Sequence, residues 1–386
     1  MVAANSALIS TLPPLSLYVH IPWCVRKCPY CDFNSHENRN IPEQEYIAAL
    51  LQDLTQDQQL ARGRRIESIF FGGGTPSLFS AASYDQLLQC INDIVPINAG
   101  AEITLEANPG TFEYEKFAGF HNSGINRLSI GVQSFDSRQL QALGRIHNRD
   151  EAINAIRAAR NVGFDKLNID LMHGLPQQTV DSALADLQQA IELEPSHLSW
   201  YQLTIEPNTV FFNKPPTLPE DDALGDIEDA GKALLQEQGF QQYETSAYAK
   251  PGFQCAHNLN YWRFGDYLAV GAGAHGKITD MESSKVVRYQ KTRLPQDYLN
   301  PQKAFTSRQQ NVSAQDLSFE FFMNALRLQE DIPKSLFTAR TGLPIAVVDD
   351  AVQEAIKQGL LENHLDHWRT TELGQRFLNT LLHLFQ

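Results

Sequence analysis

Residues 18–33, YVHIPWCVRKCPYCDF, carry three of the five cysteines of this chain in the spacing C-x3-C-x2-C: Cys24, Cys28 and Cys31. Three thiolates on one short loop can bind iron or zinc, and they are one ligand short of the usual four. Zinc is one interpretation of this spacing, because His20 or His36 could supply the fourth ligand. An iron site with a free coordination position is the other.

The residues before the cysteines favour the iron site. Residues 17–21 (LYVHI) form a short apolar run that is typical of a strand, and Pro22 ends it. The cysteines therefore follow the C-terminal end of a predicted strand, where α/β and barrel enzymes place their chemistry. An iron with a free coordination position at such an edge would be a reaction site rather than a structural support.

Strand and helix patterns alternate downstream of this loop. Further strands are predicted at 66–71, 101–108, 127–134, 166–174 and 197–206, and helical periodicity separates them. This alternation predicts a parallel sheet with helices outside it, and six strands are too few for a closed eight-stranded barrel. We therefore predict an α/β fold, a partial (β/α)6 barrel, for residues 1–207.

Polar side chains mark the ends of these strands. Glu106, Gln133, Arg145 and Asp170 lie on or just beyond strands of the predicted unit. Taken singly, each fits a helix cap or an ion pair, because a buried polar group needs a partner. Together they predict one polar ligand site along the C-terminal edge of the sheet. The three glycines at 72–74 either bring backbone close to a ligand or form a plain turn.

The motif HIPWC…CPYCDF resembles the oxygen-independent coproporphyrinogen III oxidase family of radical S-adenosylmethionine (SAM) proteins, and within it the HemW branch of heme chaperones. The resemblance implies a [4Fe-4S] cluster on the three cysteines. It also implies that the fourth iron binds SAM, which one electron can cleave to a 5′-deoxyadenosyl radical. Residues at the matching motif positions are then expected to bind SAM: Tyr18, Tyr30, Gly73, Gly74, Thr75, Glu106, Gln133, Arg145 and Asp170. Thr204 is a weaker candidate.

Residues 208–312 are predicted to extend the barrel through short strands near 242–248 and 266–277. The connecting segment between these strands contains HNLNYW at 257–262. From the residues alone, we favour a motif whose His and Tyr form hydrogen bonds between two domains, with Trp262 in the core. His is, however, also a normal axial ligand of heme iron. The resemblance implies that His257, Tyr261 and Trp262 bind heme, and His275 in GAGAHG is a second candidate.

Residues 313–386 are predicted to form a mostly helical, winged-helix-like domain. Winged-helix modules often bind DNA, but this segment has ten acidic and six basic residues, a net charge of −4. The whole chain has a formal charge of −14, which also argues against a nucleic-acid partner. We interpret the segment as a lid or a docking module for a partner protein.

Composition predicts a cytoplasmic globular protein. Hydrophobic residues make up 42% and charged residues 20% of the chain, and no apolar run approaches the roughly 20 residues that span a bilayer. The first residues lack a signal-peptide pattern, and clustered cysteines are typical of a reducing compartment. We expect no membrane span, with peripheral membrane contact as the remaining alternative.

The resemblance implies two functions of different classes. The first is a heme chaperone that binds heme and transfers it to an unidentified acceptor protein. The second is coproporphyrinogen III dehydrogenase, a radical enzyme that decarboxylates its substrate. The dehydrogenases have a further Cys two residues after the third cluster Cys and a longer N-terminal arm. This chain has Phe33 there and seventeen residues before Tyr18. We therefore predict the chaperone and assign no catalytic residue. A radical SAM enzyme with another substrate is the third interpretation.

Overall fold

The computed structural model of the chain describes residues 9, 11–38, 40–110 and 113–386. The predicted barrel unit at 1–207 therefore includes several residues that lie outside the described ones. The main sheet has twelve strands in the order β14-β13-β12-β11-β1-β4-β5-β6-β7-β8-β10-β9. Its six central strands are parallel, which confirms the predicted alternation: β1 (Leu15–Ile21), β4 (Ile66–Gly73), β5 (Ile97–Ala107), β6 (Arg127–Gln133), β7 (Lys166–His173) and β8 (His197–Gln202).

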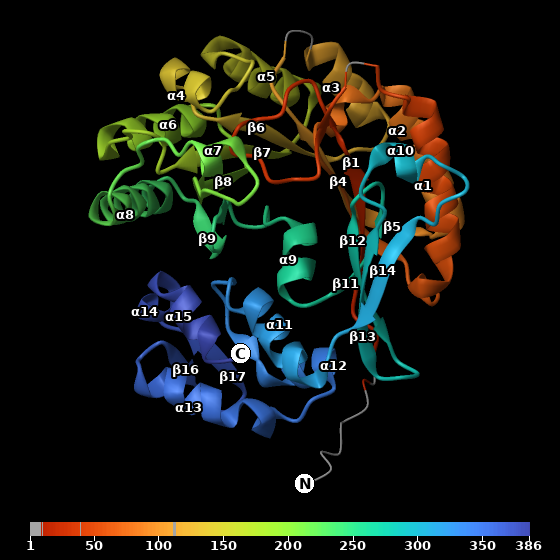
Figure 1. Cartoon of the computed structure of the whole chain (residues 1–386). Helices are drawn as coiled ribbons and strands as arrows, with labels where there is room; N and C mark the ends of the chain where they lie inside the picture. Colours follow the sequence, from red (N-terminus) through yellow and green to blue (C-terminus); the bar gives the residue numbers. More distant parts are fainter. Residues whose placement is uncertain (1–8, 10, 39, 111–112) are drawn as a thin grey trace.

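Helices cover the outer side of this curved sheet (Figure 1). They are α1 (Glu43–Asp57), α2 (Ala81–Ile94), α3 (Glu113–Asn122), α4 (Ser137–Ala142), α5 (Arg149–Val162), α6 (Val180–Glu192) and α8 (Asp221–Glu237). The short α7 (Val210–Asn213) lies instead against the cysteine loop, where the N–H of Phe211 donates to the carbonyl of Pro29 at 3.0 Å. Local sequence sets their ends. In α5, Asn148 and Glu151 form a capping box, and Gly163 ends the helix with φ at 107°.

The two faces of the central strands differ in chemistry. On β1, the alternate residues Leu15, Leu17, Val19 and Ile21 are fully buried in the main hydrophobic core. The residues between them, such as Tyr18, therefore point to the other face of the sheet. Polar side chains occupy equivalent inward positions on the neighbouring strands and hydrogen-bond to one another: Ser16 with Ser68, Ser129 with Asp170, and Asn168 with His197. The inner face is consequently a polar surface rather than a second apolar core.

Extra strands extend the sheet at both edges. β9 (Gln241–Glu244) and β10 (Ala247–Ala249) are added beyond β8, and β11 (Asp266–Val270) pairs in parallel with β1. The antiparallel strands β12 (His275–Asp280), β13 (Lys285–Lys291) and β14 (Thr306–Asn311) complete the other edge, before and after the short α10 (Pro295–Tyr298). The sequence predicts strands near 242–248 and 266–277 but not β13 and β14. The HNLNYW motif is helical, as α9 (Ala256–Trp262), and lies on the inner side of the arc (Figure 1).

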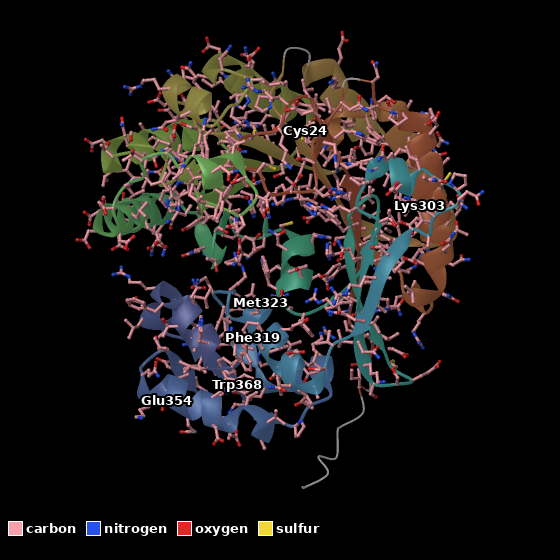
Figure 2. The ribbon with its side chains drawn as sticks, viewed as in Figure 1. Cys24, Lys303, Phe319, Met323, Glu354 and Trp368 are labelled. Carbon is pink, nitrogen blue, oxygen red and sulfur yellow. The ribbon has the colours of Figure 1, made fainter. Side chains whose placement is uncertain are left out.

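The C-terminal module has its own hydrophobic core around Phe322, Phe337 and Trp368. It contains α11 (Ala314–Ala325), α12 (Lys334–Thr341), α13 (Asp349–Lys357), α14 (Glu372–Arg376), α15 (Leu378–His383) and a small sheet of β15 (Ile332–Pro333), β17 (His367–Thr370) and β16 (Leu361–Asn363). The β16–β17 hairpin corresponds to the predicted wing. Figure 2 marks Trp368 inside this module and Met323 on the side nearer to α9. None of the helices described is long and apolar enough to cross a membrane.

Candidate functional site

The cysteine loop begins where β1 ends. Cys24 closes the two-residue strand β2 (Trp23–Cys24), which pairs with β3 (His36–Glu37), and Figure 2 marks it at the top of the arc. Cys24, Cys28 and Cys31 are free thiols and half-buried. Thr75 Oγ1 donates to Cys24 Sγ at 3.5 Å, and Arg145 Nη1 donates to Cys28 Sγ at 3.6 Å. Burial raises the pKa of the Cys24 thiol, and the hydrogen bond from Thr75 partly offsets that rise.

The two flanking histidines are engaged elsewhere. Both ring nitrogens of His20 have partners, the hydroxyl of Tyr18 at 2.9 Å and the carbonyl of Asn34 at 3.0 Å. His36 Nε2 lies 3.2 Å from Asn34 Oδ1. The zinc interpretation with His20 as fourth ligand therefore has no support in this geometry.

The glycines at the end of β4 allow a close approach to the cysteine loop. Gly73 has φ at 113°, and a Cβ there would lie 2.5 Å from the His20 ring. A Cβ on Gly74 would lie 2.5 Å from the carbonyl oxygen of Trp23. The backbone N–H groups of Gly74 and Thr75 donate to Ile21 and Trp23 at 2.8 and 2.7 Å. Any side chain at these positions would push the loop away from the strand.

A chain of polar side chains links two of the cysteines. Asn108 Nδ2 donates to Thr75 Oγ1 at 2.9 Å, and Arg145 donates to Asn108 Oδ1 and, at 2.6 Å, to the carbonyl of Gly131. The prediction that Arg145 lies on or just beyond a strand is wrong. It belongs to the loop between α4 and α5, and its bond to β6 brings it to the rim. Asn108 was not among the predicted site residues, although an Asn-Pro pair directly after β5 marked its position.

Three of the predicted carboxamide and carboxylate side chains reach the inner face near this rim. Glu106 Oε2 accepts from the N–H of Gly73 at 3.2 Å, and burial, with the nearby charge of Asp170, raises the pKa of Glu106 to about 8. Burial also raises the pKa of Asp170, which accepts from Ser129 at 2.9 Å. Gln133 has φ at 72°, and its Oε1 accepts from the Tyr201 hydroxyl at 2.6 Å.

The remaining predicted SAM residues differ in placement. The ring of Tyr30 lies 6.3 Å from that of Phe211, and burial raises the pKa of its hydroxyl. Thr204 is exposed and donates to Glu206 at 3.0 Å, so it lies apart from the other residues of the inner face.

A cavity of about 710 Å³ lies on the inner side of the sheet. Tyr18, Gly73 and Glu106 line it from the central strands, and His257, Tyr261 and Trp262 line it from α9. His275 at the start of β12 also lines it. The structure therefore brings three of the nine predicted SAM residues and the predicted heme motif to one cavity. Cys28, Thr75 and Arg145 line a smaller adjacent cavity of about 150 Å³.

The helix α9 is held from both ends. The Glu102 carboxylate accepts from the N–H of Ala256 at 2.8 Å, at the N-terminus of α9. At the other end, the Arg327 guanidinium lies 4.5 Å from the Trp262 ring. Trp262 is half-buried, so the interpretation of this residue as core is wrong.

The imidazole of His257 is half-buried and neutral. Its Nδ1 lies 3.3 Å from Ser68 Oγ, and its ring lies 5.1 Å from that of Phe70. Burial lowers the pKa of His257 to about 4. A neutral imidazole with one nitrogen hydrogen-bonded is the form that binds metals.

Known proteins resemble this chain over nearly its full length. Residues 18–190 match the model of the radical SAM superfamily, and residues 312–377 match the HemN C-terminal domain. The chain is 54% identical over 375 residues to the heme chaperone HemW of Escherichia coli (strain K12), covering 97% of this chain and 98% of that protein. The corresponding protein of Haemophilus influenzae is 55% identical over 379 residues, with 97% and 98% covered.

A solved structure shares the architecture of nearly the whole chain. Coproporphyrinogen III oxidase (HemN) from Escherichia coli, described as a radical SAM enzyme, superposes with a TM-score of 0.82 at 25% identity. The match covers 97% of this chain and 90% of that one. With relatives this similar over almost their full length, the chain belongs to the HemW family of the radical SAM superfamily.

Proposed function

We propose that this protein is a heme chaperone, which binds heme and transfers it to an acceptor protein. Relatives that carry the name heme chaperone HemW match it over nearly their full length, which supports this function. We further propose that it works in the cytoplasm, because a reducing compartment preserves the free thiols of Cys24, Cys28 and Cys31.

These three cysteines fit a [4Fe-4S] cluster, which the radical SAM family implies together with SAM. They are unpaired, lie on one loop, and receive hydrogen bonds from Thr75 and Arg145. When bound, the cluster and SAM supply one-electron chemistry, and the protein contributes orientation and exclusion of water. Within that arrangement Thr75 and Arg145 stabilise the negative charge of the thiolates.

For SAM we propose the residues at the rim beside the cluster loop. The backbone at Gly73 and Gly74 and the carboxylate of Glu106 suit the amino group of SAM, and Arg145 suits a carboxylate. The other side chains assigned to SAM are those on the inner face or beside the cysteines: Tyr18, Tyr30, Thr75, Gln133 and Asp170.

For heme we propose α9. His257 offers a neutral imidazole as a ligand for the iron, and Tyr261 and Trp262 offer aromatic surface to the macrocycle. The observation that carries this proposal is the cavity of about 710 Å³, which these residues share with Tyr18 and Glu106.

We also propose that the chain is divided into a core at 1–207, an extension at 208–312 and a C-terminal module at 313–386.

Coproporphyrinogen III dehydrogenase is the second candidate, and the superposition with HemN favours it. Position 33 favours the chaperone instead. Phe33 is 60% exposed and lines the cavity, whereas the dehydrogenases are expected to carry a cysteine there. A phenylalanine cannot ligate a metal, whereas a cysteine thiolate can.

Two measurements under anaerobic conditions separate these functions. The protein with reconstituted cluster should bind heme, and His257→Ala should weaken binding and change the heme absorption spectrum. His383→Ala is the matched control, because His383 is exposed on α15. Wild-type affinity and spectrum in His257→Ala would contradict the assignment to α9. Turnover of coproporphyrinogen III with SAM and reductant would contradict the chaperone.

A further inference from the structure

Arg293 is a cation at the wall of the cavity that α9 shares with the central strands. It follows β13, and it is the one Lys or Arg among the described residues that line this cavity. No carboxylate of the described chain lies within ion-pair distance of it. Arg288, five residues earlier, pairs with Glu320 at 2.7 Å. Asp32 and Glu106 also line the cavity, but neither pairs with the exposed Arg293, so its guanidinium is available to an anionic ligand.

The side chain of Arg293 is held in place. Its Nε donates to Asn34 Oδ1 at 3.3 Å, and Asn34 Nδ2 donates back to the carbonyl of Arg293 at 2.9 Å. The same amide donates to the carbonyl of Ala272 at 2.8 Å. Gly273 makes room for this contact, because a Cβ there would lie 2.3 Å from Asn34 Nδ2.

This arrangement leaves the terminal nitrogens of the guanidinium for a ligand. Nε is occupied by Asn34, and no hydrogen bond to another described residue engages Nη1 or Nη2. A planar guanidinium with one edge anchored is well suited to a carboxylate, which can accept two parallel hydrogen bonds from it. The carboxylate of Asp32 also lines the cavity, so a ligand with negative groups gains from a local cation there.

We propose that Arg293 binds a carboxylate of the ligand that fills this cavity, namely one propionate of heme. The inference rests on the proposed function, since it takes heme as the ligand. His257 and Arg293 come from different elements, α9 and the segment after β13, and line the same cavity. Binding the iron at one and a propionate at the other would set the orientation of the macrocycle.

The test compares heme with its dimethyl ester, in which both propionates are neutral. Both would be titrated, without SAM, into the wild type, Arg293→Gln and Arg293→Lys. A charge-assisted hydrogen bond contributes about tenfold or more in affinity, so the wild type should prefer heme over the ester by about tenfold. Arg293→Gln should lose this preference while binding the ester as the wild type does, and Arg293→Lys should keep part of it.

Arg65→Gln is the matched control, because Arg65 is exposed and does not line the cavity. It should behave as the wild type. An unchanged preference for heme in Arg293→Gln would overturn the assignment of Arg293 and leave the proposed function intact. SAM would be titrated separately into the same variants. An Arg293→Gln variant that weakens SAM binding and leaves the preference for heme unchanged would also overturn the assignment, and would assign the guanidinium to the SAM carboxylate. A wild type that binds neither porphyrin would overturn both proposals.

Discussion

The carboxylate of Glu102 ties the cavity helix α9 to the sheet. Its Oε1 accepts from the N–H of Ala256 at 2.8 Å, and its Oε2 lies 3.6 Å from Arg127 Nη1. The side chains of Glu102 and Arg127 are both 2% exposed. Arg127 in turn donates to the carbonyl of Phe253 at 3.2 Å. The pair therefore holds the segment that leads into α9 at two points.

Glu102→Ala should destabilise the protein strongly. Removing one member of a buried ion pair costs about 3–5 kcal/mol, because the other charge stays buried without its partner. Loss of the acceptor at the N-terminus of α9 adds about 1 kcal/mol. Combining Glu102→Ala with Arg127→Met removes both buried charges and leaves only Lys166, which lies 3.4 Å from Glu102 Oε2 and is 38% exposed. The double variant should therefore regain more than about 2 kcal/mol relative to the sum of the single losses.

Urea unfolding monitored by tryptophan fluorescence measures these differences. Glu67→Ala is a suitable control, because Glu67 is exposed on β4 and its loss should change the unfolding free energy by less than about 0.5 kcal/mol. A Glu102→Ala variant within about 1 kcal/mol of the wild type would refute the reasoning about burial. So would a double variant that shows simple additivity. Heme affinity should fall together with stability, because α9 carries His257.

Three other sets of contacts give further predictions. Burial and Asp170 raise the pKa of Glu106 to about 8, so at lower pH Glu106 must lose a proton before its carboxylate can accept from the SAM amino group. SAM affinity should therefore rise by up to about tenfold per pH unit as pH increases toward 8, and isothermal titration of Glu106→Gln should show no such rise. Lys291 Nζ lies 2.5 Å from Asp53 Oδ1 with both side chains fully buried, and Lys291→Met should lower the free energy of unfolding in urea by about 3–5 kcal/mol; a loss under about 1 kcal/mol would contradict this. Cys24→Ala should lack the broad brown absorbance of the reconstituted protein, whereas Cys90→Ala should keep it.

Much of the fold could be predicted because its signals are local. Strand and helix periodicities repeat along residues 17–206, and parallel strands joined through helices place all their C-terminal ends at one edge. The cysteine spacing and the polar residues at those strand ends therefore located the candidate cluster and SAM sites. The cysteine spacing alone did not decide whether the metal is iron or zinc. The resemblance of HIPWC…CPYCDF to a known family then predicted a [4Fe-4S] cluster and SAM.

Tertiary structure alone decided how distant segments meet at the cavity. The strand order places β11 beside β1, and this brings α9 against the inner face, with His257 next to Ser68 at a separation of 189 residues. Asn34 likewise hydrogen-bonds to Arg293, although the two residues are 259 positions apart in the sequence. Hydrogen bonds across the rim likewise brought Asn108 and Arg145 to the cysteines. No local pattern encodes such pairs, because the contacts depend on the order in which strands pair and on which face each side chain occupies.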